Sequence, residues 1–498
     1  MKNLNIKIKG LCILGFGLFA GCNKILDIKP TDKIDASNAI TSMTDLSQAV
    51  VGVYSVMGNT SVQYRTAGNA DIVISSLMSD ENYLPNENKS GNGVNTYRWF
   101  INPEDENTAG NWGSSKTPTN PVVFTGSNYA VIDRANRVLR VIDNIPTSNN
   151  SELTSRTNLK GELLALRAYC HFQVLKSYAE NYEPQSLGIP YMEVINDAPG
   201  SVKPSRPSVA ETFAKIERDL LEAKQLLTTS SDITRITPAA VSAILARVSL
   251  YEKKWDEAIL YATEAINNKP LASRAEFPGI WTDVNDKEII WKLKRESDND
   301  KIGQFYRTSA DVVEYAASLK LIASYNQSDD VRFSSYIRID PTRGDGKTPN
   351  LVNKYVGGNN LVPGLADIKL FRIAEMFLIR AEAYTEKGAA DNFLKASNDI
   401  NTLRSARINN YTAVDYSDKT ILINEIYLER FRELAFEGHR YFDLRRRSLT
   451  IDRNPIAADD AGGASSITLT ASQRAYYLPI PGFELRANEN MDQNPQYR

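Results

Sequence analysis

Apolar residues recur at every third or fourth position over long stretches of the chain, which is the spacing of amphipathic helices. In the first stretch Leu159, Leu163, Leu166 and Cys170 form a continuous apolar stripe. The helices predicted by this spacing cover about 159–182, 238–251, 255–266, 370–384 and 396–403. The pattern therefore predicts a mostly α-helical protein.

Three of these helices resemble one another in sequence. Arg167, Arg247 and Arg380 each follow a run of four apolar residues and have a His or Tyr four positions later. This form is typical of tetratricopeptide-like repeats, whose helix pairs bury their stripes by stacking on neighbours. The repeats lie 80 and 133 residues apart, so insertions must separate them. We expect a right-handed superhelix of helix pairs with long loop-rich insertions and a few short strands.

Two insertions combine polar loops with aromatic side chains. They span 82–128 and 276–306, and alternating residues over 288–294 predict a strand in the second. Such loops suit carbohydrate, because aromatic rings stack on the apolar face of a sugar while polar groups reach its hydroxyls. The residues expected to contact ligand are Trp99 and Trp112, then Tyr83, Tyr97, Arg98 and Asn111, then Tyr306. The alternative is that each aromatic residue is a buried loop anchor, above all Trp281 and Trp291.

The composition excludes several classes of function. The 498 residues include 58 Lys and Arg against 60 Asp and Glu, so no uniform basic field exists to bind nucleic acid. Two His and three Cys cannot form a His-rich metal site, a four-Cys zinc site or a disulfide-dense scaffold. The sequence 298–300 weakly resembles a calcium loop but lacks the full ligand spacing, and a solvated turn explains it as well. We expect no metal and no cofactor.

The first residues form a targeting segment. Three Lys precede an apolar run over 11–20, which is about half the length that spans a membrane. The sequence 18–22, Leu-Phe-Ala-Gly-Cys, resembles the lipobox of bacterial lipoproteins, which implies lipidation of Cys22 and removal of residues 1–21. An ordinary secretion signal is the alternative. The chain that begins at Cys22 has 55 basic and 60 acidic residues, a net charge of −5.

Catalytic signatures are missing from the sequence. It contains no G-x-S-x-G elbow, no H-E-x-x-H and no phosphate-binding glycine loop. Cys170 and His171 are adjacent on a predicted helix and so cannot face each other as a nucleophile and its base. A pair of glycosidase carboxylates cannot be assigned from sequence, because their separation is unknown. We therefore expect a binding protein and not an enzyme.

Several blocks of the sequence carry a family resemblance. Residues 22–27 with Pro30, then 79–81 and 163–178, look like the start of the SusD/RagB family of outer-membrane nutrient-binding lipoproteins. Residues 429–445 are similar to the most recognisable segment of that family. Its usual ending resembles Tyr477-Leu478-Pro479-Ile480-Pro481, then Glu484, Asn488 and Asn494-Pro495. The resemblance covers nearly the whole chain after residue 21.

The resemblance implies a lipid-anchored protein of the outer membrane, exposed at the cell surface. It would bind oligosaccharides and deliver them to a SusC-like TonB-dependent transporter as its partner. The alternatives are the same fold binding peptides or protein fragments, and a lipid-anchored hydrolase. The expected regions are a signal peptide over 1–21, an N-terminal SusD-like region with the helical repeats over 22–270, and a C-terminal SusD/RagB region over 271–498. Ligand positions vary within the family, so none transfers by motif.

The segment 429–445 has a structural interpretation of its own. Its spacing predicts a helix that ends near Gly438, with Glu429 paired to Arg432 and Glu437 paired to Arg440. Its apolar residues should enter the core, namely Phe431, Leu434, Phe436 and Phe442. His439 has no identifiable catalytic partner, so we expect a structural role for it.

Overall fold

The computed structural model describes residues 39–57, 70–89, 93–103, 124–195, 202–228, 230–296, 301–357 and 362–498. The longer helices are α3 (Met43–Val56), α4 (Ala70–Met78), α6 (Phe124–Leu139), α7 (Asn150–Tyr178), α8 (Val209–Leu226), α9 (Pro238–Glu252), α10 (Trp255–Ile266), α14 (Ile373–Lys387), α15 (Ala390–Ser405) and α16 (Lys419–Glu433). The shorter ones are α5 (Val94–Tyr97), α11 (Phe277–Trp281), α12 (Leu319–Ser324), α13 (Val331–Tyr336), α17 (Arg440–Arg445) and α18 (Gly482–Ala487).

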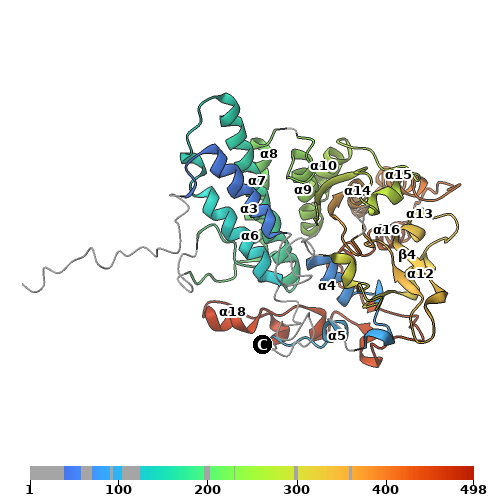
Figure 1. Ribbon diagram of the computed structural model, residues 1–498. Helices are drawn as coiled ribbons and strands as arrows, with labels where there is room; N and C mark the ends of the chain where they lie inside the picture. Colours follow the sequence, from blue (N-terminus) through green and yellow to red (C-terminus); the bar gives the residue numbers. More distant parts are fainter. Residues whose placement is uncertain are drawn as a thin grey trace, which may run out of the picture.

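The helices form two groups that lie side by side in Figure 1. In one group α3 packs on α6, α6 on α7 and α7 on α8. In the other α9 packs on α10, α10 on α14, and α14 on both α15 and α16. Contacts between α8 and α9 join the groups, and α18 lies at the lower edge of the view. The mostly helical, tetratricopeptide-like architecture expected from the sequence is confirmed.

Capping residues explain where the repeat helices begin. Thr237 accepts a hydrogen bond from the amide of Ala240, and Pro238 occupies the first turn of α9. Helix α7 begins at Asn150, well before the predicted 159, because the Asn149 side chain caps the amide of Glu152. The first half of α7 is polar and lies outside the apolar stripe, so apolar periodicity could not detect it.

The strands are short and pair in twos. They are β1 (Asn82–Tyr83) with β3 (Ala316–Ala317), β2 (Ile289–Leu293) with β6 (Ile368–Arg372), β4 (Ile337–Ile339) with β5 (Asn350–Val352), and β7 (Ile451–Asp452) with β8 (Thr468–Leu469). All pairs are antiparallel, and Leu293 lies opposite Ile368 in the pair β2–β6. The strand predicted over 288–294 is confirmed as β2, although all five of its residues are buried and not just alternate ones. Because β6 takes residues up to Arg372, α14 begins three residues later than predicted.

The segment 429–445 differs from the single helix expected to end near Gly438. Helix α16 ends at Glu433, and a turn with positive φ at Phe436 (64°) and Gly438 (85°) separates it from α17. A Cβ on Gly438 would lie 2.8 Å from the backbone of Asp71, so a larger residue does not fit there. The predicted burial of the four apolar side chains, Phe431, Leu434, Phe436 and Phe442, is confirmed.

The ion pairs of this segment are long-range and not helical. Glu437 pairs with Lys354 at 2.7 Å and Arg372 at 2.6 Å, and not with Arg440 as predicted. Arg440 instead contacts Asp80 in the first half of the chain, with 2.7 Å between its Nε and the carboxylate. The predicted pair of Glu429 with Arg432 exists only at 3.8 Å, while Arg332 and Arg404 bind Glu429 at 2.5 and 2.7 Å. Helical spacing could not reveal these partners, which come from other elements.

The core draws on both predicted regions. One cluster of buried apolar residues extends from Ile40 to Ile480. Cys170 lies within it, and burial raises the pKa of its thiol, so the thiolate is disfavoured. None of the helices in the described ranges is both long and apolar enough to cross a bilayer. Cys22 and the sequence 298–300 lie outside those ranges, within which no cluster of His, Cys, Asp and Glu is arranged to hold a metal.

Candidate functional site

Four of the aromatic residues expected to contact ligand are buried. Trp99 is 6% exposed, and its indole N–H donates to the carbonyl of Met78. The guanidinium of Arg453 lies 4.2 Å from the Trp99 ring and 3.8 Å from the Tyr97 ring. These contacts make the rings packing surfaces for a buried cation and leave no open face for a sugar.

Tyr83 and Tyr306 are buried as well. The Tyr83 hydroxyl bonds with Thr348 and accepts from the amide of Asn350, and the Tyr306 hydroxyl lies 2.9 Å from that of Ser76. The four rings are buried against partners far away in the sequence, as the alternative of buried loop anchors expects, and their assignment as ligand contacts stays a prediction. Arg98 is partly exposed and donates to the Ala461 carbonyl at 2.9 Å. Trp112 and Asn111 lie outside the described residues, and their assignment stays a prediction.

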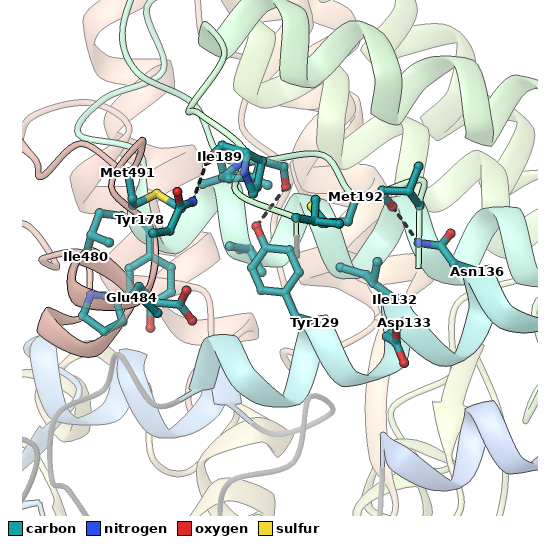
Figure 2. Close-up of a pocket in the computed structure, with 18 residues that line it drawn as sticks. Tyr129, Ile132, Asp133, Asn136, Tyr178, Ile189, Met192, Ile480, Glu484 and Met491 are labelled. Carbon is teal, nitrogen blue, oxygen red and sulfur yellow. Dashed lines mark hydrogen bonds between the residues drawn. The ribbon is translucent and has the colours of Figure 1, made fainter. Parts of the chain in front are cut away.

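A pocket of about 300 Å³ lies between α6 and α18, and we call it the α6–α18 pocket. Figure 2 shows its three sides: one face of α6, the extended segment 189–194, and the C-terminal residues 480–491. The end of α7 contributes Val174 and Tyr178, and the loop before α8 contributes Val202 and Pro204. Its volume is at the lower end of the range of about 300–1,000 Å³ usual for small-molecule sites.

Helix α6 contributes the aromatic ring of Tyr129 to the pocket. Tyr129, Ile132, Asp133 and Asn136 are spaced by three and four positions, which places them on one side of the helix. The Tyr129 side chain stands in the pocket and points toward the segment 189–194 (Figure 2). It is partly exposed, whereas Trp99, Tyr97, Tyr83 and Tyr306 are buried.

Hydrogen bonds hold the segment 189–194 against α6 and α7. The Tyr129 hydroxyl donates to the carbonyl of Pro190 at 2.9 Å, and the Asn136 amide donates to the carbonyl of Met192 at 2.9 Å. The backbone amide of Met192 donates to Nε2 of His171 at 2.8 Å, while Nδ1 of that ring donates to the Arg167 carbonyl. Both ring nitrogens are used by the neutral form, so His171 positions this wall of the pocket.

A buried charge pair supports His171 and Asn136 from behind. Arg167 binds Asp219 at 2.6 Å and donates to the side-chain oxygen of Asn136 at 2.9 Å. The His171 ring stacks on Tyr191 with 3.8 Å between centroids, and the Tyr191 hydroxyl donates to Asp219. Burial lowers the pKa of His171 to about 3, so the ring stays neutral at physiological pH.

The C-terminal side of the pocket brings a carboxyl group. Glu484 and Asn488 are spaced by four positions along α18 and its end, and both line the pocket. The Asn488 amide donates to the carbonyl of Pro204 at 2.7 Å, which ties α18 to the loop before α8. Burial raises the pKa of Glu484, and burial followed by the nearby Glu484 carboxylate raises that of Tyr129.

The remaining walls are aliphatic, with Ile132, Val174, Ile189, Met192, Val194, Ile480, Pro481 and Met491 facing the cavity. One partly exposed ring, the carboxyl groups of Asp133 and Glu484, and apolar walls suit the reversible binding of an uncharged ligand with an apolar face.

The sequence patterns indicated only part of this site. Glu484 and Asn488 stand in the block that resembles the family ending, but nothing in their spacing indicated a pocket. Tyr129 lies one residue after the polar insertion 82–128, which was expected to carry the ligand contacts. Three segments more than 40 residues apart meet here, and that meeting is not visible in any local pattern.

Comparisons with known proteins cover most of the chain. A model described as the SusD family matches residues 346–497, and one described as starch-binding associating with outer membrane matches residues 24–250. SusD-like protein P38 of Formosa agariphila is 22% identical over 507 residues, covering 91% of this chain and 93% of that protein. Starch-binding protein SusD of Bacteroides thetaiotaomicron is 39% identical over 132 residues, which cover 26% of this chain and 22% of SusD.

The fold agrees with solved structures. A SusD superfamily protein from Bacteroides thetaiotaomicron superposes with a TM-score of 0.77 and 23% identity, covering 91% of this chain and 100% of that one. This likeness shows a shared fold. The family is shown by the two models, which match residues 24–250 and 346–497: the chain belongs to the SusD/RagB family.

Proposed function

We propose that this protein binds oligosaccharides at the outer membrane and delivers them to a SusC-like TonB-dependent transporter. One matching model is described as starch-binding and associating with outer membrane, and the SusD of Bacteroides thetaiotaomicron is named for starch binding. Lipidation at Cys22 would anchor the protein to the membrane, with the binding domain exposed at the cell surface. The protein would bind its cargo and pass it on without chemical change.

The observation that carries the proposal is the α6–α18 pocket. It combines a partly exposed tyrosine ring, a carboxyl group and an apolar wall, which are the elements that hold a sugar by its apolar face and its hydroxyls. Its size fits a short part of a glycan, and the rest of the chain would extend into solvent. The net charge of −5 expected after removal of residues 1–21 favours neutral cargo over anionic cargo.

Titration of the protein without its signal peptide against a panel of neutral oligosaccharides tests the proposal. Ala487 is exposed on α18 and lines the pocket, so Ala487→Trp fills the pocket without disturbing the core. We expect this variant to lose affinity by at least about tenfold. Ala390→Trp is the matched control, since Ala390 is exposed on a helix that does not line the pocket.

Two results would contradict the proposal. The protein could bind no oligosaccharide while binding peptides, which would make peptide its cargo. It could also hydrolyse a labelled polysaccharide, which would make it an enzyme. The transporter is tested separately, because the full-length protein should copurify from its native outer membrane with a large TonB-dependent transporter.

A further inference from the structure

The polar side chains around the α6–α18 pocket are largely committed to the protein itself. The Tyr129 hydroxyl and the Asn136 amide donate to the carbonyls of Pro190 and Met192, as described above. The side-chain oxygen of Asn136 accepts from Arg167 at 2.9 Å. A ligand therefore finds few partners on the α6 side of the pocket.

The same holds for the neighbouring groups. Asp133 pairs with Arg137 at 2.8 Å. The Asn488 amide donates to Pro204, and its oxygen accepts from the backbone of Asn490 at 3.0 Å. Each of these interactions satisfies a side chain that would otherwise contact a sugar hydroxyl.

Arg206, a buried cation behind the wall of the pocket, is also engaged. Its guanidinium donates to the carbonyls of Gly188, Leu187 and Asp492 and to the side chain of Asn494. It does not line the pocket, so it offers no direct contact to an anionic ligand.

Glu484 differs from these groups. Its carboxyl group lines the pocket beside Tyr129 and has no hydrogen bond or ion pair within the described part of the chain (Figure 2). As a carboxylate it accepts hydrogen bonds and repels other anions. Glu484 is thus the carboxyl group of the described lining that has no protein partner, whereas the other carboxyl group, Asp133, is paired with Arg137.

The shortage of free hydrogen-bonding groups in the lining limits how many hydroxyls a bound sugar can carry into the pocket. A hydroxyl pressed against Met192, Ile189 or Ile480 gives up its water and gains no partner, which disfavours binding. A methyl group at the same position gains apolar contact instead. A carboxylate or sulfate would face the Glu484 carboxylate, and the described lining of the pocket includes no Lys or Arg.

On the basis of the proposed function, we propose that the α6–α18 pocket selects a neutral, hydroxyl-poor sugar unit of the 6-deoxyhexose type. The methyl group at C6 lies against the aliphatic wall that includes Ile189, Met192 and Ile480. The apolar face of the sugar ring stacks on Tyr129, and one ring hydroxyl donates to the carboxylate of Glu484. Uronic acids are excluded by charge.

Two series of methyl glycosides that differ only at C6 test this selectivity. The first comprises D-fucose, D-galactose and D-galacturonic acid, and the second comprises D-quinovose, D-glucose and D-glucuronic acid. Affinities are measured by ligand-observed NMR on the folded protein. In at least one series the 6-deoxy sugar should bind at least about tenfold more tightly than the 6-hydroxyl parent, and the acid should not bind. Equal or tighter binding of the parent or the acid in both series would overturn the inference.

Glu484→Gln tests the role of the carboxylate, and Glu489→Gln is its matched control. Glu489 is exposed on the same segment and contacts Lys203 at the surface. Glu484→Gln should lower the affinity for the 6-deoxy sugar by about tenfold and raise the affinity for the acid relative to that for the 6-deoxy sugar. The control should change neither affinity. Unchanged selectivity in Glu484→Gln would remove Glu484 from the contact. If oligosaccharides bind, lose affinity in Ala487→Trp and show no preference at C6, this inference alone is refuted. If no oligosaccharide binds at all, the proposed function is refuted.

Discussion

Glu433→Gln is the variant that best tests the structural role of the family segment. The Glu433 carboxylate is fully buried and is shared by three buried arginines. It accepts from Arg332 at 3.1 Å, from Arg372 at 2.9 Å and from Arg407 at 3.1 Å. An amide keeps the shape of the side chain but has one acceptor oxygen fewer and directs N–H groups at guanidinium donors.

The expected loss of stability depends on which carboxylates the three arginines keep in Glu433→Gln. Removing one partner of a buried ion pair costs about 3–5 kcal/mol. Each arginine keeps another carboxylate: Arg332 keeps Asp330 and Glu429, Arg372 keeps Glu288 and Glu437, and Arg407 keeps Glu288. We therefore expect the lower end of the range, a loss of about 3 kcal/mol in the free energy of unfolding.

The sign of the pH dependence provides a second check. Burial alone would raise the pKa of Glu433, but the guanidiniums of Arg407, Arg372 and Arg332 outweigh burial and hold it below its usual range. The stabilising effect of the carboxylate is thus present above the unfolded-state pKa of about 4.3 and is lost as the pH falls below it. The difference in the free energy of unfolding between wild type and Glu433→Gln should therefore become smaller as the pH falls from about 5 to about 3.

Urea unfolding followed by both tryptophan fluorescence and circular dichroism measures the difference, provided that the two transitions coincide. Glu489→Gln serves as control and should change the free energy by less than about 0.5 kcal/mol. Glycan affinity of the folded variant should match wild type, because Glu433 does not line the α6–α18 pocket. A loss below about 1 kcal/mol, or a loss of binding without a loss of stability, would refute the reasoning.

Three further predictions concern the pocket wall, pH and the anchor. Tyr129→Phe removes the bond to Pro190 and should cost about 1 kcal/mol of stability while the ring still lines the pocket, as thermal unfolding and titration can show; unchanged stability would contradict that bond. Burial lowers the pKa of His171 to about 3 and that of His439 well below 6.5, so both stay neutral when folded while the unfolded chain takes up protons. The free energy of unfolding should therefore fall by up to about 1.4 kcal/mol per pH unit per histidine between pH 6.5 and pH 5, and His171→Phe should flatten that slope in urea titrations. Cys22→Ser should abolish fatty-acid labelling and release the protein from the membrane fraction, and retention there would refute the anchor.

The repeat helices could be predicted because each buries one stripe whose period is local. Helices α9 and α10 agree with the expected ranges to within one residue, since Thr237 and Pro238 mark the start of α9. Lys253 then adopts a left-handed conformation at the turn between them. Patterns of this kind depend on residues a few positions apart, and the sequence displays them directly.

The candidate ligand residues could not be predicted in the same way. Trp99 and Tyr97 stand in a polar loop, yet Arg453, more than 300 positions later, packs against both rings. A sequence shows that an aromatic residue is in a loop but not which of its faces is covered. The α6–α18 pocket could not be predicted either, because Tyr129 and Glu484 lie 355 positions apart in the chain.

The buried charges explain how the family blocks act together. Asp80 of the first block binds Arg440 of the later one, and Glu81 accepts from the backbone amide of Phe436 at 3.1 Å. The residues that carry the resemblance therefore join the two halves of the chain. For Asp80, Glu81, Phe436 and Arg440 this role is structural.

A crystal structure of the protein with the tightest-binding neutral oligosaccharide would test the central claim most directly. The account predicts a sugar ring against Tyr129 in the α6–α18 pocket, with a hydroxyl within about 3 Å of the Glu484 carboxylate. An empty pocket with the oligosaccharide bound elsewhere, for example against Trp112, would contradict it.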